Sequence, residues 1–280
     1  MPVGEGAPLV WPEGVGAPEP TGIPHAVAHR SRTPKVGDWR GTIRSLYMAS
    51  SATVPAVREE ARRIAGRLEA TLRVPDAEPR GIAVVTHPLP THGGTMRNPL
   101  VAAIARACAE RGLYALRFNF RGTEGSEGEF TSGREEARDL EAAVAEARSI
   151  APGRPLLVAG FSFGALMILR WLAAGGAPDA YALLGVPLRG VTLATQALPP
   201  VPDGAFIVQG EHDQFGSAAE LRAALPRARI VEIPGVDHFF VVRASVDASA
   251  TGPSGALRDR YREVAAIVAD ELLRDARLAG

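Results

Sequence analysis

The chain has few of the features that would tie it to a membrane or to a disulfide framework. It contains one cysteine, Cys108, so no disulfide can form within the chain. The place of this cysteine among apolar residues of the predicted helix 98–111 favours a packed thiol over a reactive one. No run of about 18 apolar residues occurs, so no membrane span is predicted. The N-terminus lacks the charged start and apolar stretch of a secretory signal, and a cytoplasmic location is therefore expected.

Charge of one sign is not in excess either, and motifs for metals and nucleotides are missing. The 31 lysines and arginines equal the 31 aspartates and glutamates, so neither nucleic acid nor a membrane is expected as a partner. The six histidines form no His-Glu-x-x-His pattern, so no metal is predicted. The glycine runs near 93 and at 122–128 match neither the dinucleotide fingerprint nor the phosphate loop. We expect no cofactor, and the sequence leaves the oligomeric state open, with a homo-oligomer among the alternatives.

What is present indicates one α/β domain preceded by a different kind of segment. Residues 1–47 are rich in proline and glycine and have no sustained apolar periodicity, which predicts a disordered extension. Residues 48–280 have a length that suits one doubly wound domain, and the chain's 46% hydrophobic content supplies a core. Met48 stands just before this domain, which raises the hypothesis that translation starts there.

Strand and helix patterns alternate along the domain. Loose alternation over 67–74 predicts an antiparallel edge strand. Further strands are predicted near 82–86, 114–119, 155–160, 180–185, 205–209 and 229–233, and helices near 98–111, 133–149, 163–174, 217–225 and 256–278. This order predicts a three-layer α/β/α sandwich with a mostly parallel sheet.

The most informative motif is the pentapeptide Gly160-Phe161-Ser162-Phe163-Gly164. It stands between an apolar strand-like run and a long apolar helix candidate. A serine on such a turn has an exposed Oγ, and the flanking glycines remove side chains that would collide across the bend. Glycine-flanked serines also cap helices, so the pentapeptide alone is only suggestive. A reactive serine needs a histidine base, an acid and oxyanion donors, and each has a candidate.

The acid and base candidates follow in the order serine, acid, histidine. Asp213 and His238 each come just after a predicted buried strand. Because parallel strands end at one edge of a sheet, Ser162, Asp213 and His238 can converge there. Asp213 also has the alternative of an ordinary turn residue. Other carboxylates then compete for its role: Glu211, Asp203 and, less well, Asp237.

Together these residues resemble a compact α/β-hydrolase of the dienelactone-hydrolase-like type, without a cap. The resemblance covers roughly residues 66–278. The segments that carry it are the pentapeptide and four others: His87–Pro90 with Gly93–Met96, Arg117–Gly122 with Gly125–Gly128, Gly210–Asp213, and Asp237–Phe240. It implies that fold and a hydrolytic activity, but no particular substrate. Larger relatives insert a helical lid where this chain has only the short stretch between residues 185 and 205, so we expect no large lid domain and an open site.

Two backbone amides are predicted to receive the oxyanion of such a reaction. Phe163 follows the nucleophile and starts a helix, so its N–H also gains from the helix dipole. The second donor is expected in the loop after the strand 82–86, where Pro88 and Pro90 have no N–H. Leu89 is the remaining donor, at the position that similar enzymes use. Pro88 departs from the glycine that many relatives have there.

Five further residues are candidates for contact with a substrate: His87, Arg121, Phe161, Phe215 and Phe239. The aromatic rings would contact an acyl or small aromatic group. Each candidate also has a packing alternative. His87, like His92 and His212, is interpreted more simply as a loop-packing residue, and an arginine after a strand more often ties down a loop than binds a substrate carboxylate.

We therefore expect a serine hydrolase that cleaves carboxylic esters or thioesters of a small-molecule acyl substrate through an acyl-enzyme. The same residues could serve a peptidase or an acyltransferase. Outside enzymes, the alternative is a catalytically silent binding or scaffold protein.

Overall fold

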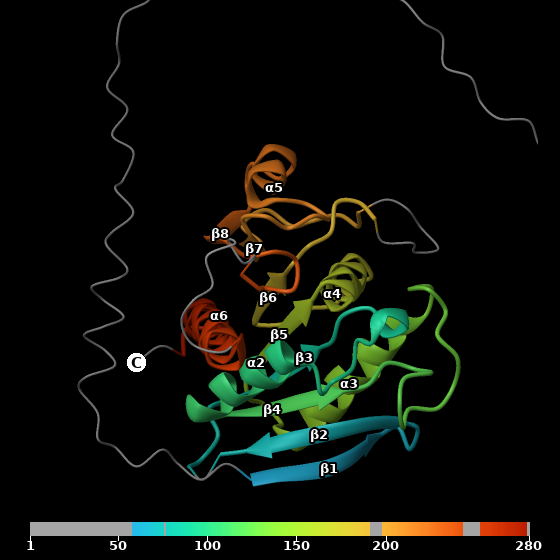
Figure 1. The fold of residues 1–280 in the computed structure, drawn as a ribbon. Coiled ribbons are helices and arrows are strands. Elements are labelled where there is room, and N and C mark those ends of the chain that lie inside the picture. Colours follow the sequence, from blue (N-terminus) through green and yellow to red (C-terminus); the bar gives the residue numbers. More distant parts are fainter. Residues whose placement is uncertain (1–57, 76, 191–197, 243–252, 279–280) are drawn as a thin grey trace, which may run out of the picture. The chain divides into compact units, whose positions relative to one another are not determined.

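The computed structural model describes residues 58–75, 77–190, 198–242 and 253–278 of the chain (Figure 1). The predicted extension 1–47 and its boundary at residue 48 lie outside the described residues.

The centre of the domain is one eight-stranded sheet in the order β1-β2-β4-β3-β5-β6-β7-β8 (Figure 1). The strands are β1 (Arg58–Ile64), β2 (Leu68–Val74), β3 (Gly81–Thr86), β4 (Leu113–Phe118), β5 (Leu156–Phe161), β6 (Ala180–Leu184), β7 (Phe206–Gly210) and β8 (Arg229–Ile233). β1 pairs antiparallel with β2, and β2 pairs antiparallel with β4. All pairs from β4 to β8 are parallel. The mostly parallel sheet predicted from the sequence is confirmed.

The edge of this sheet corrects one expectation. The predicted edge strand 67–74 is β2, which is antiparallel but internal, because β1 pairs with its outer side. β1 has the sequence REEARRI, and most of its residues are exposed or half-buried. It has no apolar alternation for a pattern search to find. Charged side chains are common on edge strands, where they discourage pairing with other chains.

Helices cover both faces of the sheet and complete a three-layer α/β/α sandwich (Figure 1). One face carries α2 (Pro99–Glu110) and α6 (Pro253–Asp275), whose apolar residues form one buried cluster with the sheet. The other face carries α3 (Glu136–Ile150), α4 (Phe163–Ala173) and α5 (Ala218–Ala224), which contribute to a second cluster. β3 and β5 lie between the two clusters, and every residue in them is buried. Such strands are typical of a parallel sheet covered on both faces.

The connections at the carboxyl ends of the parallel strands form one edge of the sheet. β3 continues into the short 3-10 helix η1 (Pro90–His92), and β5 continues directly into α4. The registers Phe161↔Leu184 and Gly210↔Ile233 bring the end of β5 level with that of β6, and the end of β7 level with that of β8. Leu184 pairs with Val208, so β7 and β8 extend two residues further at the same edge. Open α/β sheets place their ligands at this edge. The chain has no large additional lid domain among its described residues, and none of the helices described combines the length and apolar character that crossing a membrane requires.

Candidate active site

Ser162 lies at the sharp turn from β5 into α4. Its backbone has φ 55° and ψ −112°, in a region that residues with a side chain rarely adopt. A Cβ at Gly160 would lie 2.6 Å from the Gly164 carbonyl carbon, and one at Gly164 would lie 2.4 Å from Thr86 Oγ1. Both glycines are therefore required for the close approach of the helix to the strands. The turn is further held by the Ser162 N–H, which donates to the Leu184 carbonyl at 2.8 Å.

The side chains of Ser162, His238 and Asp213 form one hydrogen-bonded chain. The distance from His238 Nε2 to Ser162 Oγ is 2.9 Å, and that from His238 Nδ1 to Asp213 Oδ2 is 2.8 Å. All three residues are at least 95% buried. The carboxylate accepts a hydrogen bond from the Nδ1–H group, which keeps the ring proton on Nδ1, so Nε2 is left unprotonated and can accept the serine proton. The geometry suits removal of a proton from the serine hydroxyl by the imidazole.

The Asp213 carboxylate is held by two further donors. The Phe215 N–H donates to Oδ1 at 2.8 Å, and Gln209 Nε2 donates to Oδ2 at 2.8 Å. Gln209 is fully buried on β7, and its amide also bonds the Val186 N–H and the Gly216 carbonyl. Sequence reasoning gave Gln209 no role. A polar residue at the end of an otherwise apolar strand could have drawn attention to Gln209. Its partners could not be predicted, because they come from two separate loops.

The three competing carboxylates are occupied elsewhere. Glu211 accepts the Gly235 N–H at 2.8 Å, and Asp203 pairs with Arg227 at 2.9 Å. Asp237 Oδ1 accepts the amides of its own turn, at Phe239 and Val241. Among the described carboxylates considered for this role, Asp213 is the one that the structure brings to His238.

Three aromatic rings surround the His238 imidazole. The ring centroids of Phe215, Phe239 and Phe161 lie 4.7, 5.3 and 5.5 Å from that of His238. Phe161 is buried and packs against the imidazole, so it supports the ring and is not free to line a surface pocket. Phe239 is 49% exposed and Phe215 is half-buried, so these two rings remain accessible to an apolar group. Glycine at 185 leaves room for the imidazole, because a Cβ there would lie 3.2 Å from His238 Cε1.

The two amides predicted to receive an oxyanion lie on neighbouring segments. Phe163 is the first residue of α4, and Leu89 stands immediately before η1. A Cβ at Gly164 would lie 2.9 Å from the His87 carbonyl oxygen, so the loop that carries Leu89 packs against the first turn of α4. Within the described residues, neither the Phe163 N–H nor the Leu89 N–H donates to a backbone acceptor.

His87 is fully buried and connects two loops. Its Nε2 accepts the Phe120 N–H at 3.1 Å, and its Nδ1 lies 2.7 Å from the Pro88 carbonyl oxygen. Burial lowers the pKa of this imidazole to about 4, because a charged ring loses its hydration there. The ring is therefore neutral at pH 7, with its proton on Nδ1. The structure thus favours the loop-packing alternative for His87 over contact with a substrate.

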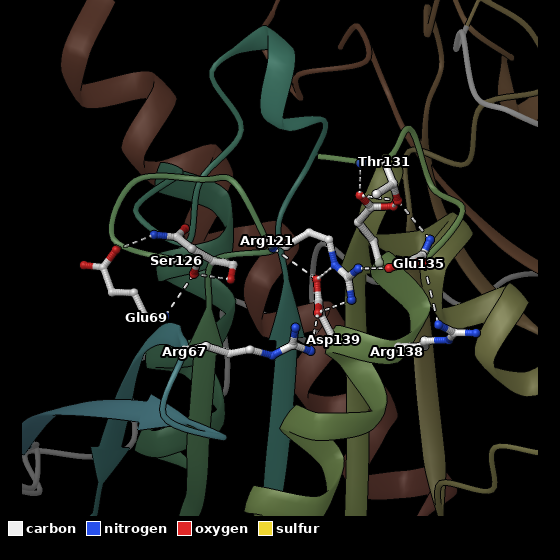
Figure 2. Close-up of polar contacts among 10 residues, drawn as sticks. Arg67, Glu69, Arg121, Ser126, Thr131, Glu135, Arg138 and Asp139 are labelled. Carbon is white, nitrogen blue, oxygen red and sulfur yellow. Dashed lines mark hydrogen bonds and ion pairs between the residues drawn. The ribbon is translucent and has the colours of Figure 1, made fainter. Parts of the chain in front are cut away.

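Arg121 is likewise occupied by protein groups (Figure 2). Its guanidinium makes two 2.9 Å hydrogen bonds with the carboxylate of Asp139, which is fully buried on α3, and it also pairs with Glu135. The Arg121 N–H donates to the same Asp139 carboxylate at 3.1 Å. With its donors engaged in this way, Arg121 ties the loop after β4 to α3. This corrects the expectation that Arg121 lines the substrate pocket.

This ion pair leads to a prediction for stability. Asp139→Asn should lower the free energy of unfolding by about 3 kcal/mol, since it removes the buried carboxylate and leaves the buried guanidinium of Arg121 with only the partly exposed Glu135 as its ionic partner. Urea unfolding measures the change. Glu135→Gln is the matched control, because the Glu135 side chain is 45% exposed and its loss should cost less than about 1 kcal/mol. Equal losses in the two variants would contradict a dominant role for Asp139.

Metal-ligating side chains do not gather within the described ranges. In the parts of the chain that are described, no cluster of three or more His, Cys, Asp or Glu side chains is placed to hold a metal ion. Cys108 is fully buried on α2, and burial raises the pKa of its thiol to about 12. A thiol in this state is a packed apolar group.

Comparison with known proteins gives one family. Residues 84–267 match the family model described as an alpha/beta hydrolase domain. The chain is 30% identical over 186 residues to the uncharacterized protein RP471 of Rickettsia prowazekii, a match that covers 62% of this chain and 78% of that protein.

Two solved structures extend the comparison. An alpha-beta serine hydrolase homologue from Coxiella burnetii is 26% identical with a TM-score of 0.59, and the match covers 78% of this chain and 99% of that one. XC6422 from Xanthomonas campestris, described as an a/b serine hydrolase without lid, is 31% identical with a TM-score of 0.55, covering 76% and 96%. These proteins share the fold and the general class to which the site geometry points.

Proposed function

The chain belongs to the alpha/beta hydrolase family, and from this premise we propose that it is a serine hydrolase of carboxylic esters or thioesters. The observation that carries the proposal is the hydrogen-bonded chain Ser162–His238–Asp213, with distances of 2.9 and 2.8 Å. The similarity to serine hydrolases in two solved structures supports the reaction class. The substrate is proposed to be a small acyl compound.

In the proposed reaction, His238 Nε2 takes the proton of Ser162 Oγ as this oxygen attacks the carbonyl carbon. The Asp213 carboxylate keeps the other imidazole nitrogen protonated and stabilises the charge that the ring acquires. The N–H groups of Phe163 and Leu89 receive the negative oxygen, and the N-terminus of α4 adds its dipole. His238 then gives its proton to the leaving alcohol or thiol, and a water activated by the same ring releases the acid.

The surroundings of the imidazole support an apolar acyl or leaving group. Phe239 and Phe215 flank His238 and are partly accessible. Arg121 is engaged by Asp139 and Glu135, so it adds no free cation for a substrate carboxylate. Apolar walls with few polar groups are usual for sites of this kind. Uncharged esters and thioesters are therefore the preferred substrate class.

Covalent labelling tests the proposal directly. A fluorophosphonate should phosphonylate Ser162 in the folded protein, because only an activated serine reacts at a useful rate. Peptide mass spectrometry locates the label, and urea-unfolded protein is the control in which labelling should vanish. A panel of short-chain esters, thioesters and lactones should then show turnover that the label abolishes. A folded protein that neither labels nor turns over any of these compounds would favour a binding or scaffold role.

The same serine could also transfer the acyl group to an alcohol or amine. Product partitioning between water and an added acceptor distinguishes this alternative, and peptide substrates test a peptidase. A cytoplasmic location is also part of the proposal, and it agrees with a lone, buried cysteine that needs no oxidising compartment.

A further inference from the structure

Hydrogen bonds of the His87 side chain restrict the orientation of the Pro88–Leu89 peptide. A nitrogen that accepts a hydrogen bond carries no proton. Because His87 Nε2 accepts the Phe120 N–H at 3.1 Å, the proton of the neutral ring is on Nδ1. That proton is donated to the Pro88 carbonyl oxygen over 2.7 Å. The carbonyl of this peptide is thus held by a side chain whose own position is fixed.

The direction of the Leu89 N–H follows from the direction of that carbonyl. A trans peptide is planar, so its N–H and C=O point in opposite directions. The Pro88 carbonyl points toward the His87 ring, and the Leu89 N–H must therefore point away from it. A rotated peptide would turn a carbonyl oxygen, which repels an oxyanion, toward the place where the donor is needed.

Gly94 packs closely against the same Pro88–Leu89 peptide. A Cβ at this position would lie 2.1 Å from the Pro88 carbonyl oxygen and 2.7 Å from the Leu89 carbonyl oxygen. The Gly94 N–H also donates to the Leu89 carbonyl at 3.0 Å. The loop therefore packs tightly around this one peptide while the Leu89 N–H itself has no backbone acceptor among the described residues.

The segment around Phe120, which holds the His87 ring, is itself held by hydrogen bonds. The Phe120 N–H, which donates to His87 Nε2, lies between Asn119 and Arg121 in the chain, and Figure 2 shows the polar contacts of Arg121. On one side, Asp139 binds the N–H and guanidinium of Arg121. On the other, Asn119 accepts the Met96 N–H at 2.8 Å and donates to Glu69 at 2.8 Å. This network thus reaches the Pro88–Leu89 peptide through the buried imidazole of His87, and it reaches Met96 in the same loop directly through Asn119.

We propose that His87 is a positioning residue for acyl transfer, which holds the Pro88–Leu89 peptide so that the Leu89 N–H faces the developing oxyanion. This inference rests on the function proposed above. Pro88 makes such a support necessary, because it has no N–H of its own to anchor the loop. The imidazole acts on the peptide and does not touch the substrate. An oxyanion exists only in the transition state, so the support affects kcat and leaves KM nearly unchanged.

Two isosteric amides at residue 87 separate the two hydrogen bonds of the ring. In His87→Asn the side-chain NH2 takes the place of Nδ1 and can still donate to Pro88, whereas the acceptor for Phe120 is lost. In His87→Gln the amide reaches the place of Nε2 and can accept from Phe120, whereas the donor for Pro88 is lost. We expect kcat to fall roughly 10- to 100-fold in the Gln variant and less than about fivefold in the Asn variant, with KM within about twofold in both.

A boronic acid gives a second readout of the same site. Its tetrahedral adduct with Ser162 is an anion that places an oxygen where the oxyanion would develop, so phenylboronic acid should lose affinity in the Gln variant by the factor by which kcat falls. His92→Asn and His92→Gln are the matched controls, because His92 is exposed on the same loop and its side chain bonds only the Thr91 hydroxyl among described groups. These controls should leave kcat and inhibition unchanged.

The outcomes separate this inference from the proposed function. If hydrolysis depends on Ser162 but the Gln variant is as active as the Asn variant or more active, His87 serves only the Phe120 contact and the inference fails alone. If the Gln variant loses catalytic efficiency through a higher KM and not through a lower kcat, the inference also fails alone. Nitrogen NMR of the unmodified protein adds a test that needs no variant to fold, since a proton on Nε2 of His87 would overturn the inference. A protein without Ser162-dependent hydrolysis would overturn both.

Discussion

Ser162→Ala is expected to lower kcat for ester hydrolysis by at least about a thousandfold, which is the scale of loss when the nucleophile of a serine hydrolase is removed. The hydroxyl is the atom that forms the acyl-enzyme, and its hydrogen bond of 2.9 Å to His238 Nε2 is its route for losing a proton. A water molecule in the place of this hydroxyl would not be attached to the chain, so it could not form an acyl-enzyme. Turnover of p-nitrophenyl acetate measures the effect.

The variant should remain folded, which makes the measurement interpretable. Alanine keeps the Cβ that the backbone already accommodates at φ 55°, so no new strain arises in the turn. Ser149→Ala is a suitable control, because Ser149 is exposed near the end of α3. The chain leads from there to the start of β5, whereas Ser162 follows the end of that strand. Its activity should equal that of the unmodified protein. Undiminished hydrolysis in the Ser162 variant would reject the nucleophile proposed here.

The sequence predicted the positions of Ser162, Asp213 and His238 because each signal is local. Each residue comes soon after the end of a parallel strand, and parallel strands end at a common edge. Their convergence therefore depends on parallel strands, whose positions apolar runs already indicate, and not on the details of side-chain packing. The oxyanion candidates Phe163 and Leu89 are predictions of the same kind, made from backbone chemistry at two strand ends.

Features that depend on contacts between distant segments could not be predicted. The role of Arg121 is set by Asp139, and the meeting of these residues depends on the rotation of α3 about its axis and on the path of the intervening loop. The Gln209 side chain hydrogen-bonds the backbone at residues 186 and 216, and no pattern within β7 predicts these partners. β1 was missed because an exposed edge strand has no apolar face to alternate.

Asp213→Asn is expected to lower kcat by about ten thousandfold, the scale of loss when an orienting aspartate becomes an amide. The carboxylate accepts at both oxygens, from the Phe215 N–H at Oδ1 and from Gln209 and His238 at Oδ2. An asparagine has one oxygen, so either orientation of its amide directs an NH2 group at another donor. With that group toward the imidazole, His238 Nδ1 becomes the acceptor and Nε2 carries the proton.

A proton on Nε2 blocks the reaction at its first step, because the ring can no longer accept the proton of Ser162. The loss should therefore appear in kcat for fluorophosphonate-sensitive hydrolysis, and labelling of Ser162 should slow in parallel. Asp203→Asn is the matched control, since Asp203 is exposed and pairs only with Arg227 among the described residues. A kcat in the Asp213 variant within about tenfold of the control would mean that the imidazole is oriented without this carboxylate. The aromatic rings of Phe161 and Phe215 would then be the groups that hold it.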